Sequence, residues 1–160
     1  MIWKGCSLND ICYPINERKI TMNYATFHST NDHDSVEFIS AEYRAMVKRA
    51  HELTRQMGEH DTKQALVLQT ADGQLYEETM DYKSPHAEDE IQTFLTGIGK
   101  DNTVVRLICC WADGSLDLPW YVFREKLCDL NPNNQEAEML LTGERTLIVK
   151  PIRVTMPPKK

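Results

Sequence analysis

A histidine and a glutamate separated by one alanine, His86-Ala87-Glu88, stand where the sequence predicts the start of a helix. Thirty residues separate Glu88 from Pro119, which is expected to begin another helix. Side chains in the first turn of a helix can point beyond its end, so two helix starts can share one site. A histidine there can bind zinc, while a nearby glutamate moves protons to and from a metal-bound hydroxide. The pattern is therefore a candidate for metal-assisted hydrolysis.

The same tripeptide has a purely structural interpretation. A glutamate in the first turn of a helix interacts favourably with the helix dipole, and a histidine beside it is unremarkable. Pairs of this type are also common by chance, and His51-Glu52 differs from the motif only in spacing. The order of the surrounding elements must therefore decide how much weight His86 and Glu88 carry.

Hydrophobic periodicity predicts helices around these residues. A helix over about 36–57 has an apolar stripe at spacings of three and four, with Asp34 and Glu37 as a capping box and Gly58 as its end. Ser84 as N-cap and Pro85 as first helical residue indicate the start of the second helix. The third helix is expected over about 119–129.

Short apolar runs bounded by turns predict the strands. They are expected at 64–70, 75–80, 103–111 and 146–150. Segment 136–142 fits either a short helix or a strand, and 152–156 is a further candidate strand. If 136–142 is a strand, the short connection over 142–146 makes the last two strands antiparallel. Alternating helices and strands are typical of an α/β protein.

This layout, with its short motifs, resembles the cytidine deaminase superfamily. Members of that family place His-x-Glu on one helix and Pro-Cys-x-x-Cys on the next. The segment Leu118–Leu127 is similar to the family's second stretch in its leading Pro119, in Arg124 and in Leu127. The resemblance covers about residues 36–156 and implies a three-layer α/β/α deaminase-like domain with a mixed central sheet.

The two cysteines that bind zinc in the family are replaced in this chain. Trp120 and Phe123 stand at their positions, and neither side chain can bind zinc, which takes Cys, His or carboxylate ligands. Both fall on one helical stripe with Leu127, so we expect them to fill the space that the metal would occupy. We therefore expect no catalytic residues, no metal and no cofactor, and we interpret His86 and Glu88 as vestigial.

Two alternatives stay open at this stage. In the first, the chain is a zinc-dependent cytosine or nucleoside deaminase, of which the bacterial toxin branch is one type. His86 then binds the metal, Glu88 is the general acid and base, and Asp117, Cys110 or Cys128 completes the ligand set. In the second, the chain is an unrelated small α/β binding protein whose two helix starts do not meet.

A second group of metal-capable side chains lies near the N-terminus. His28, His33 and Asp34, with Asp32 beside them, could ligate a metal by residue type. Clusters of this kind are more often solvated turns, which is how we interpret this one.

Charge and cysteine content limit the classes of partner and the cellular location. The 18 Lys and Arg against 24 Asp and Glu give a net charge of −6, which disfavours broad nucleic-acid binding. A single nucleotide stays a candidate ligand. The five cysteines form no Cys-x-x-Cys pair, and Cys109 and Cys110 are adjacent on an expected strand, which favours a reduced, cytoplasmic protein. No apolar run is long enough to cross a membrane, and residues 1–20 are too polar for a signal peptide.

The sequence thus predicts residues 1–35 as an N-terminal arm, 36–156 as a deaminase-like domain and 157–160 as a tail. The leading functional prediction is a non-catalytic binding or scaffold subunit. Its expected partner is another protein or further copies of the same chain, and the aromatic residues of the arm suit such docking.

Overall fold

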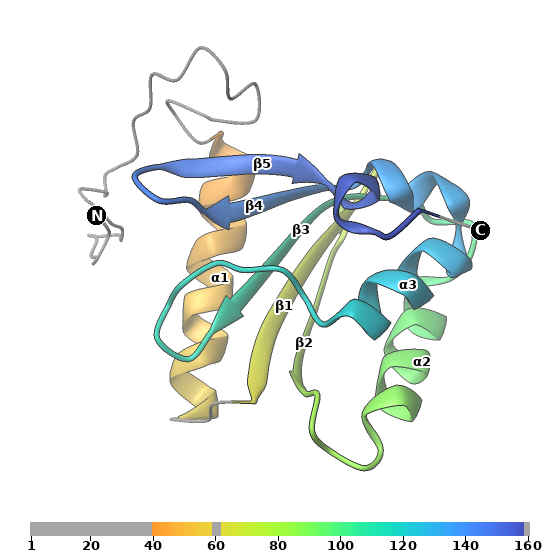
Figure 1. Ribbon diagram of the computed structural model, residues 1–160, viewed down its shortest axis with the longest axis horizontal. Coiled ribbons are helices and arrows are strands. Elements are labelled where there is room, and N and C mark those ends of the chain that lie inside the picture. The colour runs from red at the N-terminus through yellow and green to blue at the C-terminus, as the bar shows by residue number, and fades with distance from the viewer. Residues whose placement is uncertain (1–39, 59–61, 159–160) are drawn as a thin grey trace. The chain divides into compact units, whose positions relative to one another are not determined.

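The computed structural model describes residues 40–58 and 62–158 (Figure 1). The chain divides into two compact units, of which the larger contains residues 45–140 and 150–160. The α-helices and strands are α1 (Ala41–Met57), β1 (Lys63–Thr70), β2 (Leu75–Asp81), α2 (Ala87–Ile98), β3 (Val104–Trp111), α3 (Tyr121–Leu130), β4 (Glu138–Thr142) and β5 (Leu147–Pro151). No helix among the described residues is long and apolar enough to span a membrane.

Helix α1 begins later than the sequence indicates. The hydroxyl of Ser40 accepts a hydrogen bond from the backbone amide of Tyr43 (3.3 Å), so Ser40 is the N-cap and the helix begins at Ala41 rather than near residue 36. The predicted Asp34–Glu37 capping box lies outside the described residues. The helix ends before Gly58, whose φ of 73° suits glycine. The predicted apolar stripe is buried at Tyr43, Met46, Ala50, Leu53 and Met57.

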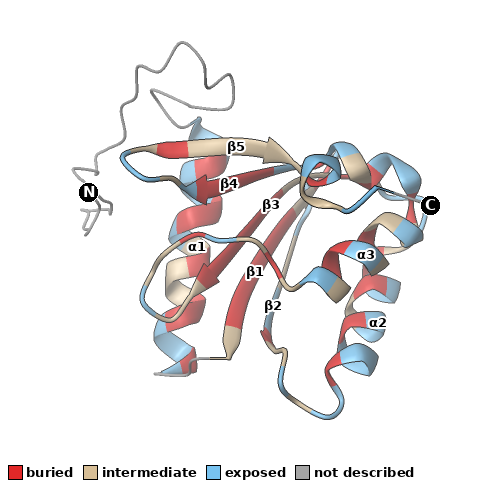
Figure 2. Ribbon diagram, viewed as in Figure 1, coloured by how far each residue is buried: buried red, intermediate tan, exposed pale blue. Residues whose placement is uncertain are grey.

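The sheet has the strand order β2-β1-β3-β4-β5. Strand β1 pairs antiparallel with both β2 and β3, whereas β3 pairs parallel with β4, so the sheet is mixed as predicted. A parallel pair needs a long crossover connection, which α3 provides between β3 and β4. Because β1 is a central strand covered on both faces, six of its eight residues are buried (Figure 2).

Helices cover both faces of the β1–β3 part of the sheet. On one face of β2, the side chain of Glu77 contacts Arg49 of α1. Tyr82 continues the strand pairing and its ring contacts Trp120 at the start of α3. Since odd and even residues of a strand point to opposite faces, α1 lies on one side and α3, with α2 packed beside it, on the other (Figure 1). The predicted three-layer α/β/α arrangement is confirmed.

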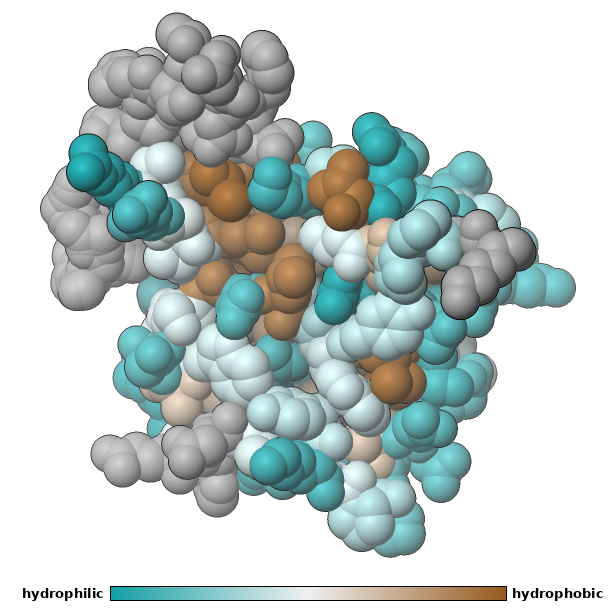
Figure 3. Space-filling view, viewed as in Figure 1, coloured by the Kyte–Doolittle hydropathy of each residue, from teal (hydrophilic) through white to brown (hydrophobic). Residues whose placement is uncertain are grey.

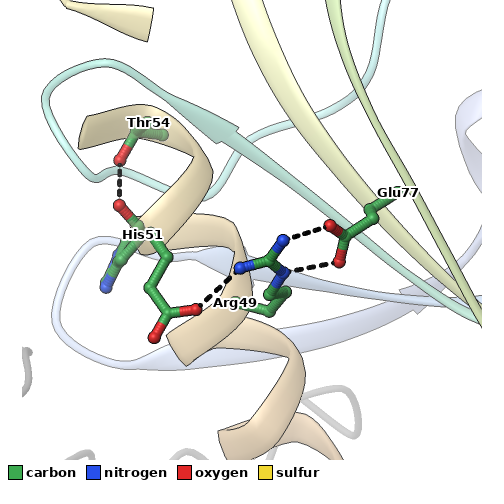
Figure 4. A network of polar contacts seen from close by, with 5 residues as sticks. Arg49, His51, Thr54 and Glu77 are labelled. Carbon is green, nitrogen blue, oxygen red and sulfur yellow. Dashed lines mark hydrogen bonds and ion pairs between the residues drawn. The ribbon is translucent and has the colours of Figure 1, made fainter. Parts of the chain in front are cut away.

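An ion pair links α1 to β2 in this arrangement (Figure 4). The guanidinium of Arg49 donates to both carboxylate oxygens of Glu77, at 2.6 and 2.5 Å, and to Glu52 at 3.0 Å. These hydrogen bonds hold the pKa of the Glu77 carboxyl below its usual value. The Arg49 and Glu77 side chains are partly exposed, so their ion pair orients α1 on the sheet more than it stabilises the fold.

The C-terminal part of the chain settles two of the open predictions. Segment 138–142 is the strand β4, preceded by a 3-10 helix over Pro132–Glu136, and 152–156 is not a strand because Ile152–Thr155 forms a second 3-10 helix. Gly143 begins the turn to β5 and donates its amide to the carbonyl of Thr146 (2.7 Å). A side chain at Gly143 would come within 2.7 Å of that carbonyl, which explains the glycine. The two strands run in opposite directions (Figure 1), as the short connection predicted.

A buried asparagine fixes the connection after α3. Asn134 is 0% exposed. Its side-chain oxygen accepts from the amide of Val104 on β3 (2.8 Å), and its side-chain amide donates to the carbonyl of Leu127 on α3 (2.9 Å). Both ends of the side chain are therefore satisfied, and α3 is tied to the start of β3.

Candidate functional site

His86 and Glu88 lie at the start of α2, but both side chains are exposed. Helix α2 begins at Ala87 rather than at Pro85, and His86 is its N-cap residue. Ser84 organises the turn before the helix: its hydroxyl accepts from the His86 amide and its carbonyl from the Ala87 amide, each at 3.1 Å. The helix start is therefore displaced because Ser84 closes a turn instead of capping the helix directly.

Helix α3 also begins later than predicted, and a residue that sequence reasoning missed explains why. The buried side chain of Gln64 donates to the Leu118 carbonyl and accepts from the Trp120 amide, both at 3.2 Å. This pair of hydrogen bonds holds the backbone extended up to Trp120, whose ψ is 139°, so the helix begins at Tyr121. A glutamine directly before the apolar run of β1 was the only sequence signal for this role.

Trp120 belongs to a cluster of half-buried aromatic rings and not to the buried stripe of the helix. Its ring centroid lies 6.0 Å from that of Tyr82, which in turn meets Trp111 edge to face at 5.8 Å. The Trp111 indole donates to Asp117 (3.0 Å), which fixes the rim of the cluster. The prediction that Trp120 shares the stripe of Leu127 is thus wrong, because Trp120 precedes the helix.

Phe123 is fully buried, at 0% exposure, on the inner side of α3 with Leu127. Its ring lies 6.3 Å from that of Phe94 on α2, with the two planes tilted by 30°. The contact joins the two helices whose starts carry His86 and Trp120 (Figure 1). An aromatic side chain therefore packs α2 against α3 at one of the two positions that resemble the family's zinc thiolates.

Arg124, part of the same resemblance, is buried and acts on the backbone. Its guanidinium donates to the Pro119 carbonyl (2.9 Å) and to the carbonyl and hydroxyl of Thr155 (2.8 and 2.7 Å). Burial lowers the pKa of this guanidinium. The residue thus ties the start of α3 to the 3-10 helix that follows β5.

The remaining predicted ligands are hydrogen-bonded, buried or half-buried. Asp117 accepts from the Trp111 indole through one carboxylate oxygen and from the Leu118 amide through the other (2.7 Å). Cys109 and Cys110 are buried, and burial raises the pKa of both thiols. A thiol binds metal as the thiolate, so this burial opposes ligation. Cys128 is half-buried on α3.

These residues do not fit a catalytic zinc. Such a metal needs three protein ligands, and no three His, Cys, Asp or Glu side chains within residues 40–58 and 62–158 form a group that could hold one. The predicted cluster of His28, His33 and Asp34 lies outside the described residues.

A second histidine of the sequence, His51 on α1, has a structural environment. Its Nε2 lies 3.1 Å from the carbonyl oxygen of Gly114, in the turn between β3 and α3. Burial lowers the pKa of His51 from 6.5 to about 4. The imidazole is therefore neutral at physiological pH, and Nε2–H donates to the turn.

The order of helices and strands, the mixed sheet and the packing of α2 against α3 define a cytidine deaminase-like fold. The chain is similar to the crystal structure of cytidine deaminase from Mycobacterium leprae, with a TM-score of 0.56 and 15% identity over 74% of this chain and 100% of that one. Cytidine deaminase from Mycobacterium tuberculosis gives a TM-score of 0.52 and 13% identity over 74% of this chain and 96% of that one. No family model matches the chain, and no curated protein matches it in sequence. The resemblance found in the sequence is thus confirmed as a fold.

Proposed function

We propose that this chain is a deaminase-fold domain without the zinc-dependent reaction, which acts as a cytoplasmic binding or scaffold subunit. The burial of Phe123 is the observation that carries the proposal. A phenylalanine packed against Phe94 occupies a position that, by resemblance, would hold a zinc thiolate. The proposed subunit has no metal and no cofactor of its own.

The environments of the other motif residues support the same proposal. His86 and Glu88 are exposed on the outside of the α2 start, where Glu88 is favourable with respect to the helix dipole. Trp120 is held by Gln64 and by ring contacts with Tyr82. The position of Glu88 and the contacts of Trp120 are therefore explained without metal or substrate.

Two further features support the proposed location and partner class. Cys109 and Cys110 are free and buried in the sheet, which suits a reduced compartment. The net charge of −6 favours a protein partner over extended nucleic acid. We propose a protein partner or self-association, and a nucleotide only as a secondary ligand.

Zinc content tests the proposal directly. The full chain would be purified without chelators or metal-affinity resin, and its zinc would be measured by elemental analysis before and after incubation with zinc and dialysis. We expect well below one zinc per chain in both samples. About one tightly bound zinc per chain, the amount that a catalytic site requires, would overturn the proposal.

A deaminase assay on the same preparation gives a second readout. Cytidine and a cytosine-containing single-stranded nucleic acid would each be incubated with the chain and with the matched variants Glu88→Gln and Glu90→Gln. We expect no ammonia release from any sample. Activity lost in Glu88→Gln and kept in Glu90→Gln, which changes an exposed neighbour on the same turn, would instead establish the enzyme alternative with an atypical metal site.

A further inference from the structure

The hydrogen bonds at the two ends of the β1–β2 ladder fix which backbone groups of β2 face outward. The Thr70 amide donates to the Gln74 carbonyl (3.0 Å), and the Tyr82 amide donates to the Thr62 carbonyl (3.2 Å). In an antiparallel pair, residues that face the partner strand alternate with residues whose amide and carbonyl point away from it. The even-numbered residues of β2 therefore face β1. The outward-facing residues are Leu75, Glu77, Thr79 and Asp81.

These outward groups form an open edge, because β2 is the first strand of the sheet. Within residues 40–58 and 62–158, the amide and carbonyl of Glu77 and the carbonyl of Thr79 make no hydrogen bond. Among the described residues, the Thr79 amide is engaged only by the exposed carboxylate of its neighbour Glu78 (3.0 Å), a local contact that Glu78 can give up when it turns to a basic side chain. Leu75 is 37% exposed, and most of the strand is exposed or half-buried (Figure 2).

The side chains along this edge carry negative charge. Strand β2 contains Glu77, Glu78 and Asp81 and no basic residue. Arg49 neutralises Glu77, but Glu78 is exposed on the opposite face of the strand. A second copy of β2 would bring like charges together across the new ladder, whereas a strand with lysine or arginine opposite Glu78 would gain an attractive cross-strand pair.

The other edge of the sheet is different in character. Strand β5 contains Lys150 and ends at Pro151, which has no amide hydrogen to offer a further strand. In the view of Figure 3, apolar side chains gather over β4 and β5. Of the two edge strands in the described part of the chain, only β2 combines outward backbone groups with an acidic edge.

We propose that the outer edge of β2 binds an extended basic segment of a partner protein, which adds to the sheet as a further strand. Main-chain hydrogen bonds to Glu77 and Thr79 supply the affinity, and a basic side chain beside Glu78 selects the partner. This site specifies the chemical character of the partner, which the proposed binding function leaves unidentified. The proposed binding site does not depend on whether hydrolysis has been lost, because β2 contains none of the residues at the starts of α2 and α3.

A designed peptide tests this edge on the full chain. The probe is a short fluorescein-labelled peptide in which lysine alternates with valine, measured by fluorescence anisotropy. Two control peptides carry either N-methyl groups on every second amide, which removes strand hydrogen bonding, or glutamate in place of lysine. We expect saturable binding of the probe and at least about tenfold weaker binding of each control. Equal binding of the N-methylated peptide, or no saturable binding of the probe, would overturn the proposal.

A pair of variants at one position locates the site. Thr79→Pro removes an outward amide without removing a bond to β1, and Thr79→Val keeps that amide. We expect about tenfold weaker binding to Thr79→Pro and unchanged binding to Thr79→Val. Circular dichroism checks that both variants fold. If Thr79→Pro does not fold, the comparison of the probe with the N-methylated peptide on the parent chain still tests the proposal. Binding of the probe to Thr79→Pro as tight as to the parent would refute the assignment to β2.

Self-association is the competing occupant of this edge. Sedimentation of the chain alone distinguishes it, since a dimer that Thr79→Pro dissolves would show that a second copy takes the edge and would overturn the basic-peptide proposal. Zinc content and deaminase activity are measured separately from peptide binding. The peptide-binding proposal can therefore be refuted while the proposed function stands, and the proposed function can be refuted while peptide binding stands.

Discussion

Replacing Phe123 with alanine tests the packing on which the proposed function rests. The side chain is fully buried on α3, and its ring meets that of Phe94 on α2. Truncating a buried phenylalanine loses its transfer free energy and leaves a cavity, at a typical cost of about 3–5 kcal/mol. Domains of this size have about 5–15 kcal/mol of total stability, so Phe123→Ala should lose a large fraction of it.

Urea unfolding of the full chain, followed by circular dichroism, measures this cost. The matched control is Tyr121→Ala on the same helix, since Tyr121 is 38% exposed and should cost less than about 1 kcal/mol. The double replacement of Trp120 and Phe123 by alanine should unfold the domain or leave it marginally stable. A Phe123→Ala variant within about 1 kcal/mol of the parent would refute the core packing of this position.

Three further predictions follow from buried or charged groups. Asn134→Ala should cost about 2–3 kcal/mol in urea unfolding, because it leaves an amide of β3 and a carbonyl of α3 without their partners; a cost below about 0.5 kcal/mol would contradict the role. The pKa of His51 is lowered from 6.5 to about 4, so the unfolded chain takes up a proton first as the pH falls. Stability should therefore decrease from about pH 6.5 to 4, by at most about 3 kcal/mol, and His51→Gln should lack this slope. The carboxyl of Glu77, whose pKa is also lowered, adds acid sensitivity only below about pH 4.5. Arg49→Met should lower the melting temperature slightly at about 0.1 M salt and by less at about 1 M, because screening weakens an exposed ion pair; an effect independent of salt would indicate a packing role instead.

The local pattern of apolar and polar residues was sufficient to predict most of the helices and strands. The apolar stripe of α1, the hairpin of β1 and β2, and strand β3 follow from side-chain periodicity, because a helix or strand must bury one face wherever the chain places it. Their order was enough to indicate the deaminase-like fold. The boundaries were less certain: Ser84 closes a turn before α2, and Gln64 delays α3 from a distant strand.

Trp120 and Phe123 stand at the two positions that resemble the family's thiolates, and the sequence alone determined that neither can ligate a metal, since this follows from residue type. Only the tertiary structure decided that these two aromatics have different surroundings. Phe123 packs between two helices, whereas Trp120 precedes the helix and joins a half-buried ring cluster. Neighbours in that cluster come from segments far apart in the chain, and periodicity carries no information about them. The outward-facing edge of β2 was decided in the same way, because the phase of its hydrogen bonds depends on its register with β1.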